Sequence, residues 1–492
     1  MSLKERVVKD TLQYSVANYV AMAIGIPLSI AIKAILGPVG SGQWALLKVM
    51  GSYGEYSDLG TRNAMIRELP RATGAGNETL STGIRDAAFS FTFLASLFSA
   101  AVLLIVSFFI HGEPVLRQGL RVLAFLVAAT QFYNFSLTSL RTSKKVKELS
   151  FVIVLNMILV AFFSVAGSLW KGVPGLVAGT LFATALSVAT ARRFGMLRFR
   201  LSWDWARIRG LLGIGFPMVL VSYVTITFLS VDSILVAKMI GTKELGFYTI
   251  ALMSVQQISA LGRFSQIILV PHIQERYGQT GTLGETTPFF VRTTHALGYF
   301  LPLVIGFVFF FVPVIVHYFL KGFEPGVPAM KILVLGYFFV AVNEMSSTLL
   351  FTANKQVKLI PILGAMVLAA SALIFAFIRA GWGIEGVALG ASTAYFLLFL
   401  STFCYAFWHL MGPSKMLRMA VEIGLVFVYF AVAALSLDRF VRWDVFWAGA
   451  VLKYFLFVLV IAPVLWRLEK KENLFGLLRK MSGIGRAKEL AA

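Results

Sequence analysis

The sequence predicts an all-α polytopic membrane protein with fourteen transmembrane helices. Of its 492 residues, 58% are hydrophobic and only 14% are charged, whereas about a quarter of the residues in an average soluble domain are charged. Apolar runs of about 20 residues, the length that crosses a bilayer, follow one another along the whole chain. Patterns shared by the two halves further predict two six-helix bundles related as parallel repeats, with two extra C-terminal helices.

The fourteen predicted helices are joined by polar segments too short to form a soluble domain on either face. They cover residues 11–36, 42–66, 86–110, 118–140, 148–169, 173–191, 209–237, 244–270, 290–318, 329–352, 357–379, 384–408, 416–437 and 443–466. The predicted domains are an N-lobe, a C-lobe, two further helices and a basic cytoplasmic tail, at residues 1–200, 201–410, 411–468 and 469–492.

Basic residues gather on one side of this topology. The loops that join even-numbered to odd-numbered helices, together with both termini, hold most of the 44 Lys and Arg residues. Positive loops face the cytoplasm, so we expect both termini to be cytoplasmic. The same asymmetry accounts for the net charge of +21, and no nucleic-acid partner is expected. The first apolar helix follows a basic segment without a small-residue cleavage site, so no removable signal peptide is expected.

The helix predicted over 42–66 carries charges in its middle. A polar stripe recurs along it at helical spacing and so lies on one face: Lys48, Ser52, Glu55, Leu59 and Arg62. A charge at the centre of a membrane helix costs about 2.5–3.5 kcal/mol on insertion scales. This face should therefore contact water or protein rather than lipid, which predicts a wet cavity beside the helix.

An internal repeat pairs this helix with the one predicted over 244–270. When Gly42 is placed on Gly246, the stripe falls on a second, mostly polar set: Leu252, Gln256, Ser259, Arg263 and Gln266. A second match aligns the glycines of KGVPGLVAGT with those of WGIEGVALGA. A six-helix repeat contains an even number of helices, so both copies have the same orientation and the substrate site is expected between them.

Three intramembrane cations are candidate ligands of an anionic substrate, because ammonium and guanidinium groups suit phosphate oxygens. They are Lys48, Arg62 and Arg263, and the predicted cavity wall also includes Gln256, Ser52 and Tyr56. Internal salt bridges, such as one between Arg62 and Asp58, are the alternative interpretation. Basic residues at the cytoplasmic mouth either attract a head group or only orient the protein: Arg67, Arg71 and Arg85.

Acidic residues inside predicted spans are candidates for ion coupling or gating, because a carboxylate in a cavity can take up a proton or ligate Na⁺. They are Glu55, Asp58, Asp232 and Glu344. Two alternatives stay open: Asp232 could instead lock helix packing, and Glu344 could pair with Arg263.

Enzymatic chemistry is not expected. The five histidines are scattered without metal-ligand spacing, and Cys404 is the single cysteine, so no metal site is predicted. The chain has no phosphate-binding loop of the G-x-x-x-x-G-K-[ST] type. No cofactor is expected beyond a coupling H⁺ or Na⁺.

Two stretches match motifs of a known transporter family. LGPVGSGQW, followed by Asp58-Leu59-Gly60 and by Arg67-Glu68, resembles an LGP-x-x-x-G-x-(W/Y) turn with a later DLG…RE pattern. VDSILVAKMIGTKELGFY is similar to a second-half signature in which an intramembrane Asp precedes a Gly-x-x-x-x-G-x-Y turn, although Ser233 stands where relatives often carry Arg. The chain thereby resembles the multidrug/oligosaccharidyl-lipid/polysaccharide (MOP) exporter superfamily, in its Wzx-like O-antigen flippase branch.

The resemblance implies a MATE/MOP-like fold, with two six-helix lobes around a V-shaped cavity lined by helices one, two, seven and eight. It implies a flippase of the bacterial cytoplasmic (inner) membrane that moves an undecaprenyl-pyrophosphate-linked oligosaccharide to the outer leaflet by alternating access, coupled to H⁺ or Na⁺. The implied partners are this lipid-linked oligosaccharide, membrane lipids, and a polysaccharide polymerase or glycosyltransferases of the same pathway.

Two other transporter classes were weighed. A cation-coupled multidrug exporter of the same fold is the main alternative, but the cationic stripe disfavours it, because cationic drugs call for an acidic cavity. A major-facilitator sugar porter would have a long central loop and usually twelve helices, and neither fits the predicted topology.

Overall fold

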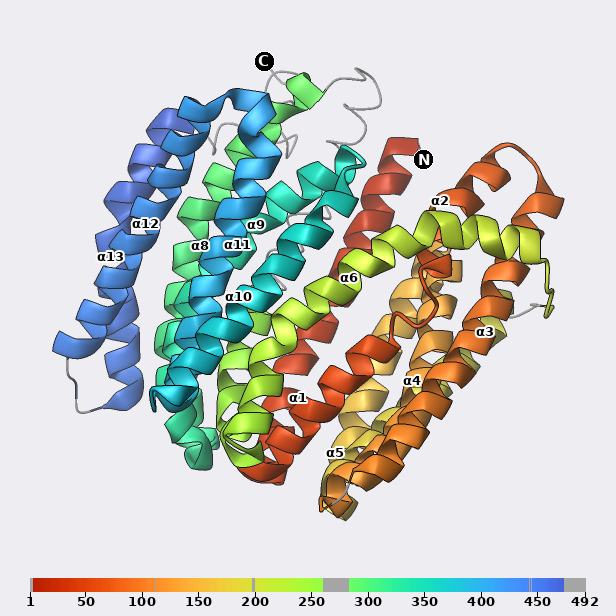
Figure 1. Cartoon of the computed structure of the whole chain (residues 1–492), viewed down its shortest axis with the longest axis horizontal. Coiled ribbons are helices and arrows are strands. Elements are labelled where there is room, and N and C mark those ends of the chain that lie inside the picture. Colours follow the sequence, from red (N-terminus) through yellow and green to blue (C-terminus); the bar gives the residue numbers. More distant parts are fainter. Residues whose placement is uncertain are drawn as a thin grey trace. The chain divides into compact units, whose positions relative to one another are not determined.

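The computed structural model describes residues 3–110, 112–196, 200–259, 283–441, 443 and 445–472, and all regular structure among them is helical (Figure 1). Packing divides the chain into two compact units, Met1–Thr249 and Ile250–Ala492. The predicted lobe boundary at residue 200 came from the sequence repeat, and it stays a prediction.

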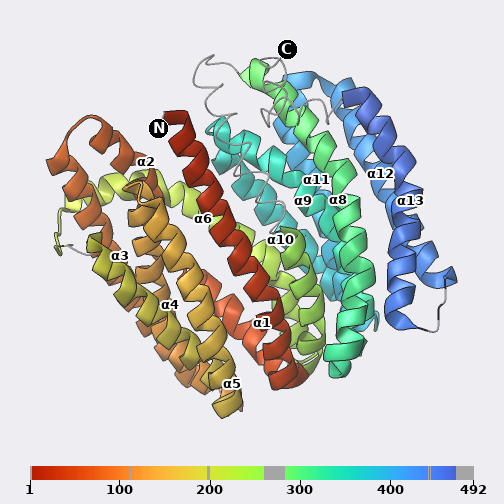
Figure 2. The same ribbon diagram turned by 180° about the vertical axis from the view of Figure 1, so that it is seen from behind.

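The first unit consists of long helices that pack both on their neighbours along the chain and on helices distant in sequence. α1 packs on α5, α5 on α4 and α4 on α3, while α6 contacts α1, α2 and α3; Figures 1 and 2 show α3, α4 and α5 side by side. The bounds are α1 (Leu3–Gly54), α2 (Thr61–Gly74), α3 (Glu78–Phe109), α4 (Pro114–Thr142), α5 (Val146–Ala191), the π-type turn η1 (Arg192–Met196) and α6 (Trp205–Met239), followed by helical residues 242–259.

The second unit is also helical. α9 packs on α8 and α11, α10 packs on α11, and α13 packs on α8 and α12. The bounds are α8 (Leu283–Phe319), η2 (Lys321–Gly326), α9 (Val327–Thr352), η3 (Gln356–Lys358), α10 (Leu359–Arg379), α11 (Gly383–Met411), α12 (Pro413–Phe440) and α13 (Phe446–Glu472).

Within the described residues, 11 helices are long and apolar enough to span a membrane, so the protein is a multi-pass membrane protein. Two of these spans contain breaks in helical geometry, one at Gly37 in α1 and one at Lys171 and Gly172 in α5. Both breaks lie where the sequence predicts a joint between separate helices. Each interrupted helix counts as one span, and the helix at 242–259 ends where the described residues end. The predicted number of fourteen helices therefore stays a prediction.

The predicted helix over 42–66 is wrong in its middle. α1 ends at Gly54, residues 55–60 form turns, and α2 begins at Thr61. Leu59 and Gly60 both have positive φ, 47° and 86°, a conformation that ends a helix. Gly60 also packs directly on the backbone of Gly215 in α6, where a Cβ would lie 2.3 Å from a carbonyl oxygen. The polar stripe is therefore divided between two helices and a turn.

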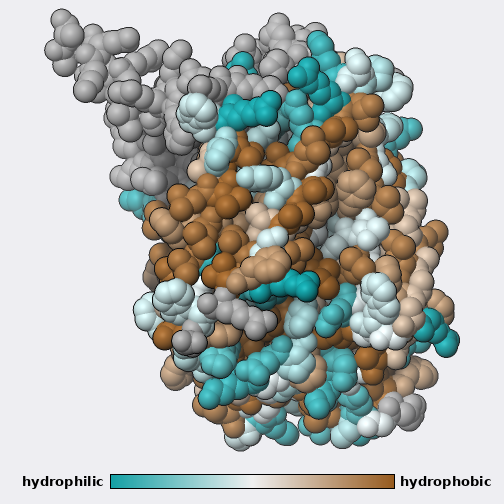
Figure 3. All heavy atoms as spheres, turned by 90° about the vertical axis from the view of Figure 1, so that its left-hand side faces the viewer, coloured by the Kyte–Doolittle hydropathy of each residue, from teal (hydrophilic) through white to brown (hydrophobic). Residues whose placement is uncertain are grey.

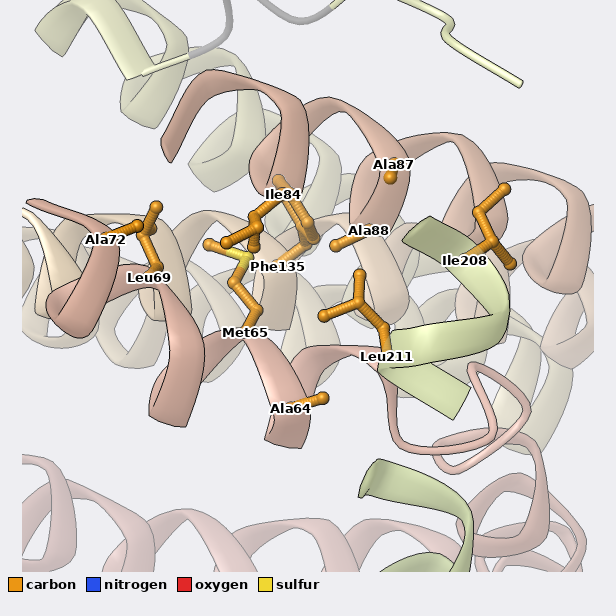
Figure 4. Close-up of a cluster of buried hydrophobic side chains, with 10 residues drawn as sticks. All are labelled: Ala64, Met65, Leu69, Ala72, Ile84, Ala87, Ala88, Phe135, Ile208 and Leu211. Atoms are coloured by element: carbon orange, nitrogen blue, oxygen red, sulfur yellow. The ribbon is translucent and has the colours of Figure 1, made fainter. Parts of the chain in front are cut away.

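The short helix α2 is fixed by an apolar core that it shares with three longer helices (Figure 4). Met65 and Leu69 of α2 are almost fully buried. They belong to one cluster with Ile84 of α3, Phe135 of α4 and Leu211 of α6. This packing fixes the start of α2, and with it Arg62, relative to α4.

Candidate functional site

Asp58 closes the start of α2. Its side chain is 1% exposed; Oδ2 accepts a hydrogen bond from the Arg62 backbone N–H (3.2 Å), and Oδ1 lies 3.5 Å from Gly60 N. Its carbonyl oxygen accepts from both the backbone N–H and the hydroxyl of Thr61, at 3.1 Å each. Irregular backbone at membrane depth must be satisfied inside the protein, and Asp58 does this for the Arg62 N–H, two residues before the N-cap residue of α2, Gly60.

Gln131 of α4 joins both sides of the break. This fully buried side chain donates from Nε2 to the Gly54 carbonyl oxygen and to Ser57 Oγ, both at 2.8 Å. Its Oε1 accepts from Arg62 Nη1 at 3.3 Å. One amide therefore satisfies a carbonyl at the end of α1 and orients the guanidinium at the start of α2.

Arg62 is held in place by three groups. Besides its bond to Gln131, its Nη2 donates to the Glu55 carbonyl oxygen (3.4 Å), and its Nε lies 3.9 Å from Asp58 Oδ2. The predicted Arg62–Asp58 pair thus exists, but only through its long Nε contact. The side chain is 13% exposed, so part of the guanidinium edge remains accessible.

A cavity of about 290 Å³ lies beside the break. Arg62 and Arg141 contribute positive charge to its wall and Glu55 contributes a carboxylate. The remaining lining residues come from α1, the turn, α4 and α5: Tyr14, Tyr56, Asn134, Leu137, Thr138, Leu149 and Ile153. The Arg141 Cζ lies 5.8 Å from the centroid of the Tyr14 ring, within cation–π range. The cavity is therefore polar, with two guanidinium groups and one carboxylate.

Arg141 was not predicted as a site residue, although the sequence contains a signal for it. Gln131, Asn134, Thr138 and Arg141 recur at helical spacing on α4, the same kind of stripe as the one in 42–66. Three of these four line the cavity, and the fourth, Gln131, accepts a hydrogen bond from the lining residue Arg62. Arg141 lies close to the predicted cytoplasmic loop, where a basic residue is explained equally well by the rule that positive loops face the cytoplasm.

Tyrosines connect the turn to α6. The rings of Tyr53 and Tyr223 are stacked with centroids 6.3 Å apart, and Tyr56 lies 6.1 Å from Tyr223. Tyr53 also donates its hydroxyl proton to Thr227 Oγ1 at 3.0 Å. Tyr56, predicted to face the cavity, contributes to the cavity wall and packs on α6 at the same time.

Lys48 and Ser52 are not part of this cavity. Lys48 is exposed on α1, with its ammonium 5.7 Å from the Trp44 ring centroid, and Ser52 donates its hydroxyl proton to the Val49 carbonyl oxygen. The structure instead reveals a further intramembrane lysine that the sequence analysis missed. Lys33 lies within an apolar run of α1 and donates to Thr249 Oγ1 at 2.8 Å.

Asp232 occupies a separate, buried site. It accepts hydrogen bonds from the Tyr248 hydroxyl at 2.8 Å and from the Ser233 hydroxyl at 3.1 Å. Its side chain therefore ties α6 to the helical residues 242–259. This geometry favours helix locking, the alternative considered for Asp232 from the sequence.

The other predicted site residues lie elsewhere. Arg67 and Arg71 are exposed on α2 and both contact Glu68, and Arg85 is half-buried on α3. Gln256 is exposed on the helix at 242–259, and Glu344 is half-buried on α9. Arg263 lies outside the described residues. Its predicted place in the cavity and its predicted pairing with Glu344 therefore stay predictions. In the described part of the chain, no group of three His, Cys, Asp or Glu residues could hold a metal ion.

The fold is similar to solved structures of MOP transporters. The lipid II flippase MurJ in an inward closed conformation matches with a TM-score of 0.63 at 14% identity, over 93% of this chain and 99% of that one. A MATE structure in complex with MaL6 gives 0.62 at 13% identity, over 83% and 97%. A MOP superfamily transporter from Pyrococcus furiosus gives 0.61 at 14% identity, over 83% and 96%. These likenesses define a MOP-type membrane transporter fold.

The sequence itself places the chain more narrowly. Residues 72–319, just over half of the chain, match the family model of polysaccharide biosynthesis proteins (Polysacc_synt_3). The protein therefore belongs to the polysaccharide biosynthesis protein family. No curated protein matches the sequence. Together, family and fold confirm the predicted superfamily and describe a transporter associated with polysaccharide biosynthesis rather than an enzyme.

Proposed function

We propose that the protein is a flippase that moves an undecaprenyl-pyrophosphate-linked oligosaccharide from the inner to the outer leaflet of the bacterial inner membrane by alternating access. The observation that carries the proposal is the cavity at the helix break, where Arg62 and Arg141 face the same space. A polysaccharide biosynthesis protein with a fold shared by the lipid II flippase MurJ is a suitable context for such a cavity.

The chemistry of the cavity suits a pyrophosphate. A guanidinium group binds phosphate oxygens through two parallel hydrogen bonds. Arg62 is already oriented by Gln131 and the Glu55 carbonyl, so little side-chain freedom would be lost on binding. At about 290 Å³, the cavity matches a head group rather than a whole oligosaccharide. In this proposal the polyprenyl tail stays in the bilayer, and Tyr14 and Tyr56 provide aromatic surfaces for the adjoining sugar.

Glu55 is the proposed site of ion coupling. Its side chain is exposed and lines the cavity with Arg62, so a proton or Na⁺ could reach it from water. One elementary charge moved across 100 mV supplies about 2.3 kcal/mol. Binding of the cation and of the anionic head group would then be coupled through the electrostatics of one cavity. Both termini are cytoplasmic in this proposal, and the polymerase or glycosyltransferases of the pathway are the expected partners.

A multidrug exporter with the same fold is the alternative function. It would require a cavity that attracts cations, and two arginines against one glutamate disfavour that. Drug-resistance profiling of a deletion strain separates the two functions, because the flippase proposal predicts unchanged drug sensitivity together with a loss of surface polysaccharide.

The direct test is translocation in proteoliposomes loaded with a fluorescently labelled, pyrophosphate-linked oligosaccharide lipid. We expect Arg62→Gln and Arg141→Gln each to slow translocation at least about tenfold, the effect of losing one hydrogen bond to a charged group. Arg121→Gln is the matched control, because Arg121 is exposed on α4 outside the cavity. Wild-type rates in both cavity variants would contradict the proposed site.

A further inference from the structure

The second unit contains a separate charged cluster, formed by three helices close to the α12–α13 connection. Lys331 of α9 and Lys453 of α13 both contact Asp438 of α12, with Nζ to carboxylate oxygen distances of 2.5 Å and 3.1 Å. Lys453 also donates to the Asp438 carbonyl oxygen at 3.3 Å. Two ammonium groups share one carboxylate, so the cluster has one positive charge in excess.

The excess charge faces a cavity of about 270 Å³. All three charged residues line it, together with aromatic side chains that include Phe309 and Trp443. The Lys331 ammonium lies 5.3 Å from the centroid of the Phe309 ring. Each ammonium has three N–H donors, and Asp438 accepts one from Lys331 and two from Lys453. Donors of both lysines therefore remain for a ligand in the cavity.

The positions of these charges are not explained by helix stability. Asp438 lies in the last turn of α12, where the helix dipole disfavours a negative charge. A partly buried ion pair also gains little over well-packed apolar residues, because desolvation offsets its attraction. All three side chains are only 20–28% exposed. The cluster is more readily explained by a ligand than by packing.

The level at which the cavity lies in the membrane indicates what kind of ligand it binds. Large aromatic side chains surround the α12–α13 connection and are well exposed: Phe440 at 78%, Trp443 at 59% and Trp447 at 58%. Tryptophan side chains such as Trp443 and Trp447 form the belts that lie at the level of lipid head groups. Figure 3 shows the side of the molecule on which α12 and α13 lie, with hydrophobic side chains over much of it and hydrophilic ones toward both ends.

We propose that this cavity binds the phosphate group of an anionic phospholipid. Lys331 and Lys453 donate to the phosphate oxygens, and the acyl chains lie against the apolar outer surfaces of α12 and α13. The site opens at the end of α13 opposite Glu472, which is the outer leaflet in the predicted orientation. The site is distinct from the cavity at the helix break, and its existence does not depend on the proposed transport function.

The test is lipid retention by the full-length protein, measured by native mass spectrometry after addition of phosphatidylglycerol or phosphatidylcholine. We expect the wild-type protein to retain phosphatidylglycerol in preference, and Lys331→Gln and Lys453→Gln each to weaken that binding about tenfold. Lys331→Arg keeps the charge and should retain the lipid. Lys321→Gln is the matched control, because Lys321 is exposed in η2, just before α9, and does not line the cavity.

We expect Asp438→Asn to change the affinity for phosphatidylglycerol in the opposite direction from the lysine variants. Removing the competing carboxylate should tighten phosphatidylglycerol binding, whereas a purely structural cluster would lose thermal stability with no change in lipid preference. An unchanged preference in both lysine variants would overturn the proposal. Inorganic phosphate provides the second arm: if it displaces phosphatidylglycerol at millimolar concentration, the site binds free phosphate and the lipid assignment fails. Translocation is not measured in either arm, so these outcomes leave the flippase proposal untouched.

Discussion

The Gln131 amide donates a hydrogen bond to the Gly54 carbonyl oxygen across 2.8 Å, joining α4 to the last residue of α1. The same side chain accepts a hydrogen bond from Arg62 at the start of α2. A single amide thus connects the integrity of the broken helix to the position of a cavity cation. Substitutions at and near Gln131 can therefore separate effects on stability from effects on transport.

Gln131→Leu should lower stability and slow translocation together. The leucine removes this donor, and the Gly54 carbonyl keeps its hydrogen bond from the Ser57 backbone N–H, so the loss costs about 0.5–1.5 kcal/mol; the substitution also frees the Arg62 guanidinium. The measurements are thermal unfolding in detergent and transport in proteoliposomes. Gln118→Leu is the control on the same helix, because Gln118 is exposed. A stable but inactive Gln131→Leu protein would show that Gln131 acts mainly on Arg62.

Gly215→Ala should destabilise the junction between α6 and the turn. A Cβ on Gly215 would lie 2.0 Å from the Gly60 carbonyl oxygen, so the two segments must separate. Gly213→Ala, two residues earlier on α6, meets nothing within 4 Å. It should stabilise the helix by up to about 1 kcal/mol. Thermal unfolding of the two variants should therefore shift in opposite directions; equal shifts would contradict the close backbone contact.

Asp58→Asn should be milder than Asp58→Ala. The asparagine side chain retains an oxygen that can accept from the Arg62 backbone N–H, whereas alanine leaves this N–H unsatisfied. Loss of a helix cap costs about 0.5–2 kcal/mol. Thermal unfolding of both variants checks this order. If Asp58 instead took part in ion coupling, the two variants would abolish ion-driven transport alike.

Glu55→Gln and Asp232→Asn should differ in their response to an ion gradient. Glu55 is exposed at the cavity, so Glu55→Gln should remove the dependence of transport on the gradient. Asp232 is enclosed by Tyr248 and Ser233, and Asp232→Asn should keep that dependence while lowering the unfolding temperature. The measurement is transport with and without an imposed H⁺ or Na⁺ gradient. The reverse pattern would assign coupling to Asp232.

The helical spans could be predicted because hydrophobic length alone determines them. The helix predicted over 118–140 is α4, and the one predicted over 209–237 is α6. The break at 55–60 could not be predicted from helical spacing, because it depends on the contact between Gly60 and Gly215, residues far apart in the chain. Glycine, serine and aspartate near the break are compatible with both a helix and a turn, and tertiary packing decides between them.

The candidate site was only partly predictable for a related reason. Arg62 and Glu55 were identified because a charge inside an apolar run is conspicuous, and Tyr56 because it directly follows Glu55. Arg141 lies at the end of its helix, where a basic residue is common, and Lys48 does not line the cavity at the break. The distinction between a cavity residue and an orienting residue depends on which helices meet, which a single sequence does not specify.

The cavity wall at the break also contains three apolar residues, Leu137, Leu149 and Ile153, on α4 and α5. The break itself is satisfied by Asp58 and Gln131, so changes in the size of these apolar side chains leave its hydrogen bonds intact. The shape of this apolar wall can therefore change while the charged part of the cavity, which holds the head group in the proposed function, stays unchanged.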